Sequence, residues 1–288
     1  MRSKNLMSKI KQILDSIKFE HTVFALPYAY IAMLLASDGM PSLNKFIWIT
    51  IAMGSARTLA MSSNRIIDRH IDKINPRTSE RHLPAGIIRL REMQFLAAVS
   101  LVIFFIAASQ LNYLCLMLSP VAALVVILYP YTKRFTWTCH FVLGFADGIA
   151  PAGAWIATTG SFSWEPIVLA FAVATWIGGF DILYSCQDYD FDIKNNLHSI
   201  PQRFGVRSAM NFAKLMHILT IFSFVSLGVL LDINPIYHLG CTIAAFLLIY
   251  EHRLVSPTDL TKIDVAFFNI NGYIAIVLFI CTLAAVYV

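Results

Sequence analysis

The chain has 288 residues, of which 58% are hydrophobic and only 14% are charged, and its net charge is +5 at neutral pH. A soluble domain carries roughly 25% charged residues, so this composition excludes an ordinary soluble domain and predicts an integral membrane protein. The five cysteines are scattered without a Cys-x-x-Cys pair, and we interpret them as small apolar fillers.

The chain begins with a basic segment, residues 1–18. Ile10, Ile13, Leu14 and Ile17 share one face of the helix that this segment could form. A basic amphipathic helix of this kind is predicted to lie on the cytoplasmic leaflet of a membrane. It does not resemble a signal peptide, because no small-residue cleavage site follows it.

Nine apolar runs follow, each read as a helix that could cross about 30 Å of hydrocarbon. A chain with many apolar runs and no alternating strands can satisfy its backbone in lipid only as helices. We therefore predict an all-α, polytopic membrane protein that forms one domain over residues 1–288. The predicted spans are 22–38, 45–63, 93–109, 112–130, 141–160, 164–186, 209–231, 235–250 and 265–287.

Lysine and arginine alternate between the two sides of these spans. They gather in the first segment and after the second, fourth, sixth and eighth spans, whereas Lys45 stands alone on the opposite side. The positive-inside rule then places the amino terminus in the cytoplasm and predicts a bacterial cytoplasmic (inner) membrane protein. This bias accounts for the net charge, so we expect membrane lipid and no nucleic acid as a partner.

A first acidic cluster ends the second span. Asn64, Asp68 and Asp72 recur every four residues, so they fall within roughly an 80° arc of one helix face. Such oxygen ligands suit Mg²⁺, which often binds through one or two carboxylates and a substrate phosphate. The alternative is a solvated helix end in which neighbouring basic residues pair with the acids.

Basic residues near this cluster could bind a diphosphate. Arg77 and Arg81 lie in the loop 75–86, which is punctuated by proline and glycine. Lys133 follows the fourth span and could reach a diphosphate that Tyr129 orients. The alternative for the two arginines is that they only follow the positive-inside rule. The alternative for Lys133 and Tyr129 is a snorkelling lysine beside a tyrosine at the membrane interface.

A second acidic cluster ends the sixth span. Helical geometry puts Asp181, Asp188 and Asp192 within about 40° of each other, bordered by Tyr184 and Gln187. A carboxylate inside an apolar stretch is a functional candidate, and the two clusters facing one another would form a cage for a divalent metal and a diphosphate.

Four more polar residues lie in or beside the apolar spans. Arg57 shares the face of the first acidic cluster, and it could pair with Asp68 or Asp181 or bind an acidic acceptor ring. Spacing alone assigns no role to three others, which are Glu20, His21 and Asp147.

These motifs together resemble the UbiA family of membrane-embedded aromatic prenyltransferases. The resemblance rests on Asn64-x-x-x-Asp68-x-x-x-Asp72, Arg77-Thr78-x-x-Arg81-x-Leu83-Pro84-x-Gly86, Tyr129-x-x-x-Lys133 and Asp181-x-x-Tyr184-x-x-Gln187-Asp188-x-x-x-Asp192. It implies a helical bundle around a central cavity that opens to lipid. It implies Mg²⁺ held through Asp68, Asp72, Asp188 and Asp192 with help from Asn64, and diphosphate bound by Arg77, Arg81 and Lys133.

The resemblance also implies the reaction. A polyprenyl group would pass from its diphosphate to a carboxylated phenol, 4-hydroxybenzoate or a similar ring, in ubiquinone or menaquinone synthesis. Asp181 or the released diphosphate would take the ring proton, and Tyr184 would support the allyl cation through its π face.

Other acceptors and classes stay open. Ala56-Arg57-Thr58 and residues 19–27 resemble the branch that makes menaquinone through futalosine, whose acceptor is similar to 1,4-dihydroxy-6-naphthoate. Haem farnesylation and transport are less favoured, because Gln187-Asp188-x-x-x-Asp192 is typical of the quinone branch and transporters bind near the bilayer centre.

Overall fold

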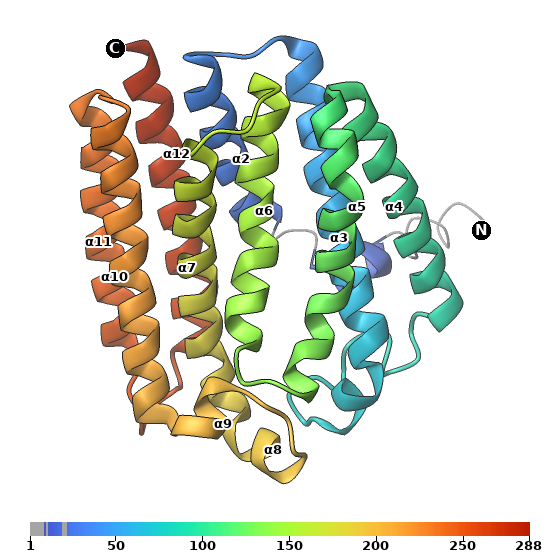
Figure 1. Cartoon of the computed structure of the whole chain (residues 1–288). Helices are drawn as coiled ribbons and strands as arrows, with labels where there is room; N and C mark the ends of the chain where they lie inside the picture. Colours follow the sequence, from blue (N-terminus) through green and yellow to red (C-terminus); the bar gives the residue numbers. More distant parts are fainter. Residues whose placement is uncertain (1–8, 10, 19–21) are drawn as a thin grey trace.

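A computed structural model of the protein describes residues 9, 11–18 and 22–288, and Glu20 and His21 lie outside these residues. Every regular element in that part of the chain is helical (Figure 1). Long helices run side by side, and the short α8 and α9 lie across one end, which we call the polar end. The long helices are α2 (Thr22–Ser37), α3 (Leu43–Ile74), α4 (Leu90–Leu111), α5 (Tyr113–Leu128), α6 (Cys139–Thr159), α7 (Glu165–Ser185), α10 (Val206–Leu230), α11 (Pro235–Leu254) and α12 (Asn271–Tyr287). The short elements are the 3₁₀ helices η2 (Tyr129–Arg134) and η3 (Cys186–Asp188), the helices α8 (Tyr189–Lys194) and α9 (Ile200–Phe204), and the π-helical turn η4 (Val265–Ile270).

The prediction of an all-helical membrane protein is confirmed. Six helical stretches of the described chain are long and apolar enough to cross a membrane: Leu90–Leu111, Tyr113–Arg134, Cys139–Thr159, Glu165–Lys194, Val206–Leu230 and Val265–Tyr287. The other three predicted spans correspond to α2, α3 and α11. That these three helices also cross the membrane, which would give nine spans, stays a prediction.

The helix α3 continues beyond the predicted apolar span 45–63 to Ile74. No proline or glycine occurs between Asn64 and Ile74, and Pro76 then favours extended backbone at the residue before it. Asn75 accordingly has ψ of 117° and caps the helix. The first acidic cluster is therefore part of a continuous helix rather than of a frayed end.

The helices α6 and α7 approach each other through glycine. A Cβ atom built on Gly144 would lie 2.2 Å from the Ala174 carbonyl oxygen, and one on Gly148 would lie 2.6 Å from that of Ala170. Any larger residue at either position would push α7 away, because backbone atoms cannot change rotamer. This contact fixes the spacing of the two helices that carry part of the site.

Part of the basic segment's apolar face packs on the protein. Ile17 is buried and Ile13 partly buried in a cluster with Leu83, Ile88 and Met93. The Lys9 ammonium also forms an ion pair with Glu92 at 2.9 Å. Ile13 and Ile17 thus pack near α4 and the loop before it, while Leu14 is exposed, and contact of the segment with the membrane stays a prediction. Ile10 lies outside the described residues.

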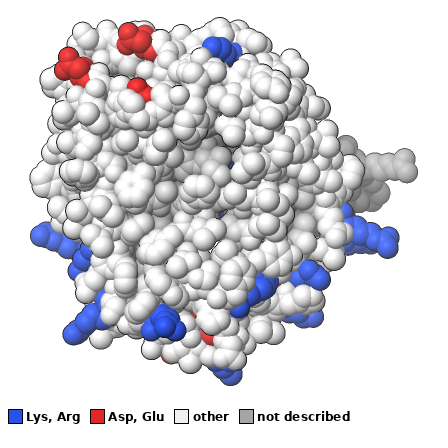
Figure 2. Space-filling model, viewed as in Figure 1, with Lys and Arg blue, Asp and Glu red and all other residues white. Residues whose placement is uncertain are grey.

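Charge is distributed unevenly along the bundle. On the face in Figure 2, Lys and Arg gather toward the polar end, and a single basic patch appears at the opposite end. The predicted alternation of basic loops agrees with this view. The assignment of the polar end to the cytoplasm stays a prediction.

The glycine contact makes a prediction about stability. Gly144→Ala forces α6 from α7 and should destabilise the protein by roughly 1–3 kcal/mol, as other overpacked positions do. The matched control is Gly153→Ala, because a Cβ there meets no atom within 4 Å. Thermal unfolding in detergent should show a lower Tm for the first variant alone. Equal Tm values would contradict the packing argument.

Candidate active site

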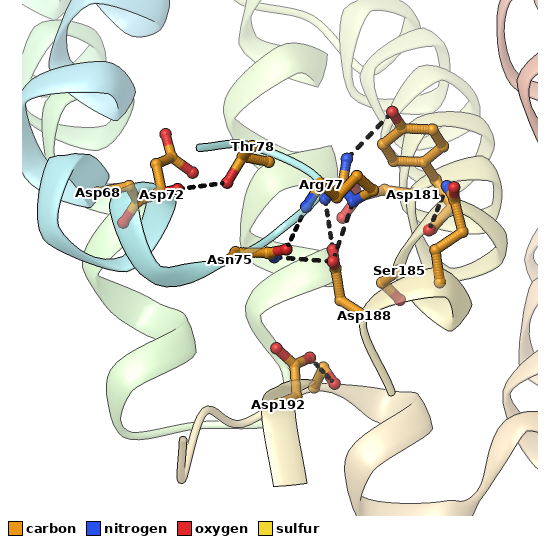
Figure 3. Close-up of polar contacts among 12 residues, drawn as sticks. Asp68, Asp72, Asn75, Arg77, Thr78, Asp181, Ser185, Asp188 and Asp192 are labelled. Carbon is orange, nitrogen blue, oxygen red and sulfur yellow. Dashed lines mark hydrogen bonds and ion pairs between the residues drawn. The ribbon is translucent and has the colours of Figure 1, made fainter. Parts of the chain in front are cut away.

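A polar cavity of about 220 Å³ lies at the polar end, between the ends of α3, η2, α6 and α7. The structure brings together here every predicted site residue except Arg57 and Gln187. Figure 3 shows Asp68 and Asp72 on one side, Asp181 and Asp188 on the other, and Arg77 between them. The predicted residues that line the cavity are Asn64, Asp68, Asp72, Arg77, Arg81, Tyr129, Lys133, Asp181, Tyr184, Asp188 and Asp192.

Asp68 is held by three residues, although its side chain is almost completely buried. Its Oδ2 accepts hydrogen bonds from Lys133 Nζ at 2.6 Å and from Asn64 Nδ2 at 3.1 Å. Its Oδ1 lies 3.1 Å from an Arg134 nitrogen in an ion pair, but it has no hydrogen-bond partner among the described residues. A buried carboxylate needs such partners, and Arg134 was not among the predicted site residues.

Asp72 is only half satisfied. Arg81 Nη1 donates to its Oδ1 at 2.8 Å, and Thr78 Oγ1 donates to its backbone carbonyl at 3.1 Å. Its Oδ2 is buried, with no hydrogen-bond partner among the residues that the structure describes. An orphaned carboxylate oxygen at a cavity wall is suited to bind a cation.

Asp188 receives a forked hydrogen bond from Arg77. Arg77 Nε donates to Oδ1 at 3.0 Å and Nη2 to Oδ2 at 2.5 Å, while Asn75 Nδ2 donates to Oδ1 at 2.9 Å. Burial lowers the pKa of the Arg77 guanidinium, but the hydrogen bond and charge of Asp188 outweigh it and hold that pKa above its ordinary value. Sequence reasoning missed Asn75, whose signal was its position directly before Pro76.

We predicted that the second acidic cluster lies on one continuous helix, and this prediction is wrong. The helix α7 ends at Ser185, η3 makes a 3₁₀ turn, and α8 starts a new helix. Asp188 and Asp192 still line the cavity, and Ser199 Oγ donates to Asp192 Oδ2 at 2.7 Å. Because of the tighter turn, Gln187 does not line the cavity. Its side-chain amide donates a hydrogen bond to the Tyr184 carbonyl instead. Asp190 is exposed.

Tyr184 is fixed by aromatic packing. The Arg77 guanidinium lies over its ring at 5.0 Å from the centroid, and Phe267 packs on the ring with centroids 4.1 Å apart. The cation that the structure places on this ring is therefore Arg77. Support of an allyl cation by Tyr184 stays a prediction.

The π-helical turn η4 places Phe267 against Tyr184. A buried amide holds that turn: Asn271 Nδ2 lies 3.2 Å from Glu251 Oε1 and 3.1 Å from the Phe267 carbonyl, and its Oδ1 accepts from Trp176 Nε1 at 2.7 Å. Buried polar groups require such pairing. The sequence shows no signal for this network, because its members lie on three different helices.

A larger, apolar cavity of about 540 Å³ lies farther from the polar end, lined by α3 to α7. Figure 2 shows the molecule hollowed near the middle of this face. Arg57 and Asp147 both line the cavity, and the charge of Asp147 acts on Arg57. Asp147 on α6 is thus a carboxylate neighbour of Arg57, and pairing of Arg57 with Asp68 or Asp181 stays a prediction.

Sequence reasoning also missed His140. Its Nδ1 lies 2.6 Å from Asp181 Oδ2, and its Nε2 lies 3.5 Å from Ser185 Oγ. All three residues line the polar cavity. Its only neighbour with metal-binding chemistry in the sequence is Cys139, so no signal linked His140 to Asp181.

The carboxylates of the polar cavity fit Mg²⁺ only if an anion completes the coordination of the ion. In the described part of the chain, no three His, Cys, Asp or Glu side chains converge as a metal site would require. Asp68 and Asp72 on one wall and Asp188 and Asp192 on the other offer one or two carboxylates each. Mg²⁺ commonly binds through such small sets when substrate phosphates complete its shell.

The helical fold with a carboxylate-rich cavity beside an apolar one is that of a membrane-embedded prenyltransferase. The UbiA prenyltransferase family matches residues 25–273, and the chain belongs to this family.

Individual proteins agree with this assignment. A 4-hydroxybenzoate octaprenyltransferase of Vibrio cholerae is 31% identical over 243 residues, covering 84% of this chain and 85% of that protein. A UbiA homologue from Aeropyrum pernix has a similar structure, with a TM-score of 0.85, 30% identity, and coverage of 92% of this chain and 98% of that one. A UbiA homologue from Archaeoglobus fulgidus bound to GPP and Mg²⁺ shares the fold, with a TM-score of 0.68 and 18% identity over 96% of this chain and all of that one.

The amide at Asn271 makes a second prediction. Asn271→Leu leaves Trp176 Nε1 and Glu251 Oε1 without their partner, and each buried unpaired group costs about 1–3 kcal/mol. We expect a clear loss of thermal stability. Asn269→Leu is the control, because Asn269 lies in η4 and is exposed. If both variants unfold at the same temperature as the unchanged protein, the turn does not depend on this amide.

Proposed function

We propose that the protein transfers a polyprenyl group from polyprenyl diphosphate to a carboxylated phenol of the 4-hydroxybenzoate type, with Mg²⁺, in quinone biosynthesis. The observation that carries the proposal is the meeting of two acidic clusters and three cations around one cavity, next to a larger apolar cavity. The name of the Vibrio cholerae relative supports the choice of acceptor.

The polar cavity suits the diphosphate. Lys133, Arg77 and Arg81 each pair with a carboxylate at its wall, so each already points a donor into the site. Mg²⁺ held through Asp68, Asp72, Asp188 and Asp192, with Asn64 beside Asp68, would stabilise the charge on the departing diphosphate. The arginines can exchange their carboxylate partners for phosphate oxygens, which have the same geometry.

The apolar cavity suits the prenyl chain and the acceptor ring. Its wall is built from apolar side chains, and Arg57 is the single lysine or arginine among its described lining residues. A carboxylate on the acceptor is a natural partner for this guanidinium. Tyr129 lines the polar cavity and lies about one turn after Val126, which lines the apolar cavity, so it stands between the two compartments. An acceptor ring bound beside Tyr129 would lie between Arg57 and the allylic carbon of the donor.

The proposal is tested with membranes that contain the protein, a labelled polyprenyl diphosphate, and either 4-hydroxybenzoate or 1,4-dihydroxy-6-naphthoate. Labelled product should form only with Mg²⁺, and the preferred ring identifies the quinone branch. Formation of no product with either ring would refute the proposal.

The carboxylates make a prediction in the same assay. Replacing Asp68, Asp72, Asp188 or Asp192 by alanine should lower the rate by about 100-fold or more, because positioned charges in such sites contribute this much. Asp190→Ala is the matched control, since this acid is exposed and lies off the cavity. Wild-type rates in correctly folded variants of the four acids would contradict their assignment as metal ligands.

Arg57 makes a prediction about specificity. Arg57→Ala should raise the acceptor KM by roughly 10-fold or more and leave the donor KM much less affected, because a charge-assisted hydrogen bond contributes about 1.5–3 kcal/mol. Steady-state kinetics with each substrate varied in turn measure both values. Equal changes in the two KM values would show that Arg57 has a structural role only.

A further inference from the structure

Arg65 is a buried cation that lies next to the first acidic cluster on α3. It is only 6% exposed, and it is not among the described residues that line the polar cavity. Burying a guanidinium is costly unless other groups accept hydrogen bonds from it, so its partners indicate its role. Its Nε donates to the Ser16 carbonyl at 3.1 Å, and its Nη1 donates to Asn64 Oδ1 at 3.3 Å. Arg65 therefore joins the amino-terminal segment to the first acidic cluster.

The contact with Arg65 fixes which way the Asn64 amide points. A guanidinium has only donors and an ionised carboxylate has only acceptors, so the amide must turn its oxygen to Arg65 and its nitrogen to Asp68. Asn64 Nδ2 accordingly donates to Asp68 Oδ2 at 3.1 Å. Without Arg65, the amide could turn over and bring its oxygen against the carboxylate, and Asp68 would lose this hydrogen bond. Arg65 thus acts on Asp68 through one intermediate side chain.

The amino-terminal segment also holds the loop that follows α3, residues 75–89. Ile17 is 3% exposed and shares an apolar cluster with Leu83 and Ile88, which are the buried apolar residues of that loop. The same loop carries Arg77 and Arg81, whose guanidinium groups pair with carboxylates at the wall of the polar cavity. Because Ile17 directly follows the residue whose carbonyl accepts from α3, one short stretch of chain contacts both the helix and the loop.

We propose that Arg65 is a positioning residue of the prenyl transfer and that residues 11–18 are its anchor, an inference that rests on the proposed function. Arg65 sets the orientation of the Asp68 carboxylate, and the anchor keeps the loop with Arg77 and Arg81 in place across the cavity. The metal-binding acids and the diphosphate-binding arginines therefore depend on one segment before α2, although no atom of that segment takes part in the chemistry.

A purely structural role for Arg65 has a different consequence from a positioning role. If Arg65 only stabilised the fold, its removal would lower the amount of folded protein and reduce the rate equally at every Mg²⁺ concentration. A positioning role instead changes the Mg²⁺ concentration that gives the half-maximal rate, because outer partners of a metal ligand contribute about 10- to 100-fold to metal affinity or activity. A titration with Mg²⁺ therefore separates the two roles.

The first test varies Mg²⁺ in the prenyl-transfer assay with membranes that contain the full chain. Arg65→Met removes the donors but keeps a long side chain, and it should raise the Mg²⁺ concentration at half-maximal rate by about 10-fold or more, with little change in the acceptor KM. Arg65→Lys keeps a charge and a donor and should give an intermediate shift. The matched control is Arg69→Met, one turn along α3, because the Arg69 guanidinium donates to the Ile66 carbonyl of its own helix. This control should keep the Mg²⁺ dependence of the unchanged protein.

The second test measures the anchor without metal, substrate or turnover. Hydrogen exchange of the full chain in detergent follows the Ile88 amide, which donates to the His82 carbonyl at 3.0 Å within the loop. Ile17→Ser removes the apolar contact and should speed the exchange of this amide by roughly 10-fold or more. Leu14→Ser is the matched control, because Leu14 is 38% exposed on the same segment. It should leave the exchange rate unchanged.

The outcomes separate this inference from the proposed function. If the unchanged protein forms no prenylated ring, the proposed function fails and the positioning role falls with it, while the exchange data still decide the anchor. If product forms but Arg65→Met has the Mg²⁺ dependence of the unchanged protein, the positioning role alone is overturned. If Arg65→Met does not fold, Arg65→Lys decides: an intermediate shift supports the role, and no shift overturns it. Equal exchange rates in Ile17→Ser and the unchanged protein overturn the anchor.

Discussion

The burial of carboxylates at the end of an apolar bundle is the constraint on which the site depends. An unpaired charge there would be costly, so Asp68, Asp72 and Asp188 each bring in a cation. Lys133 of η2 reaches Asp68 of α3, and the loop after α3 spans the cavity, with Arg81 on Asp72 and Arg77 on Asp188. The ion pairs therefore do more than neutralise charge. They tie together three segments that are distant in sequence and so give the cavity its walls.

Two compartments of opposite character follow from the same arrangement. The polar cavity is lined by several acids and cations, whereas the larger cavity is lined by small or apolar side chains apart from Arg57, Asp147 and Ser119. An amphiphilic substrate with an ionic head and a hydrocarbon tail has the same division. Binding of such a molecule requires little rearrangement, because each part finds the environment that it would otherwise lose on leaving the membrane.

The sequence predicted those parts of the site that depend on local periodicity and charge. Asn64, Asp68 and Asp72 recur at helical spacing on a helix without breakers, so their common face could be derived. The same rule failed at Gln187, because a 3₁₀ turn after Ser185 changed the angle per residue, and no proline or glycine announces that turn. His140 and Asn271 could not be found at all. Their roles depend on partners in other helices, and a single sequence holds no record of those distances.

The glycine contact between α6 and α7 has a consequence for motion. His140 lies one turn from Gly144, and Asp181 follows Gly178, whose added Cβ would lie 3.4 Å from the His140 carbonyl oxygen. Main chain rests directly on main chain here, so there is no layer of side chains whose rotamers could absorb a displacement. The distance between the imidazole and the carboxylate is thus set by the stiffness of two hydrogen-bonded backbones. Bending of the bundle would therefore be taken up where helices are separated by side chains, while this pair keeps its alignment.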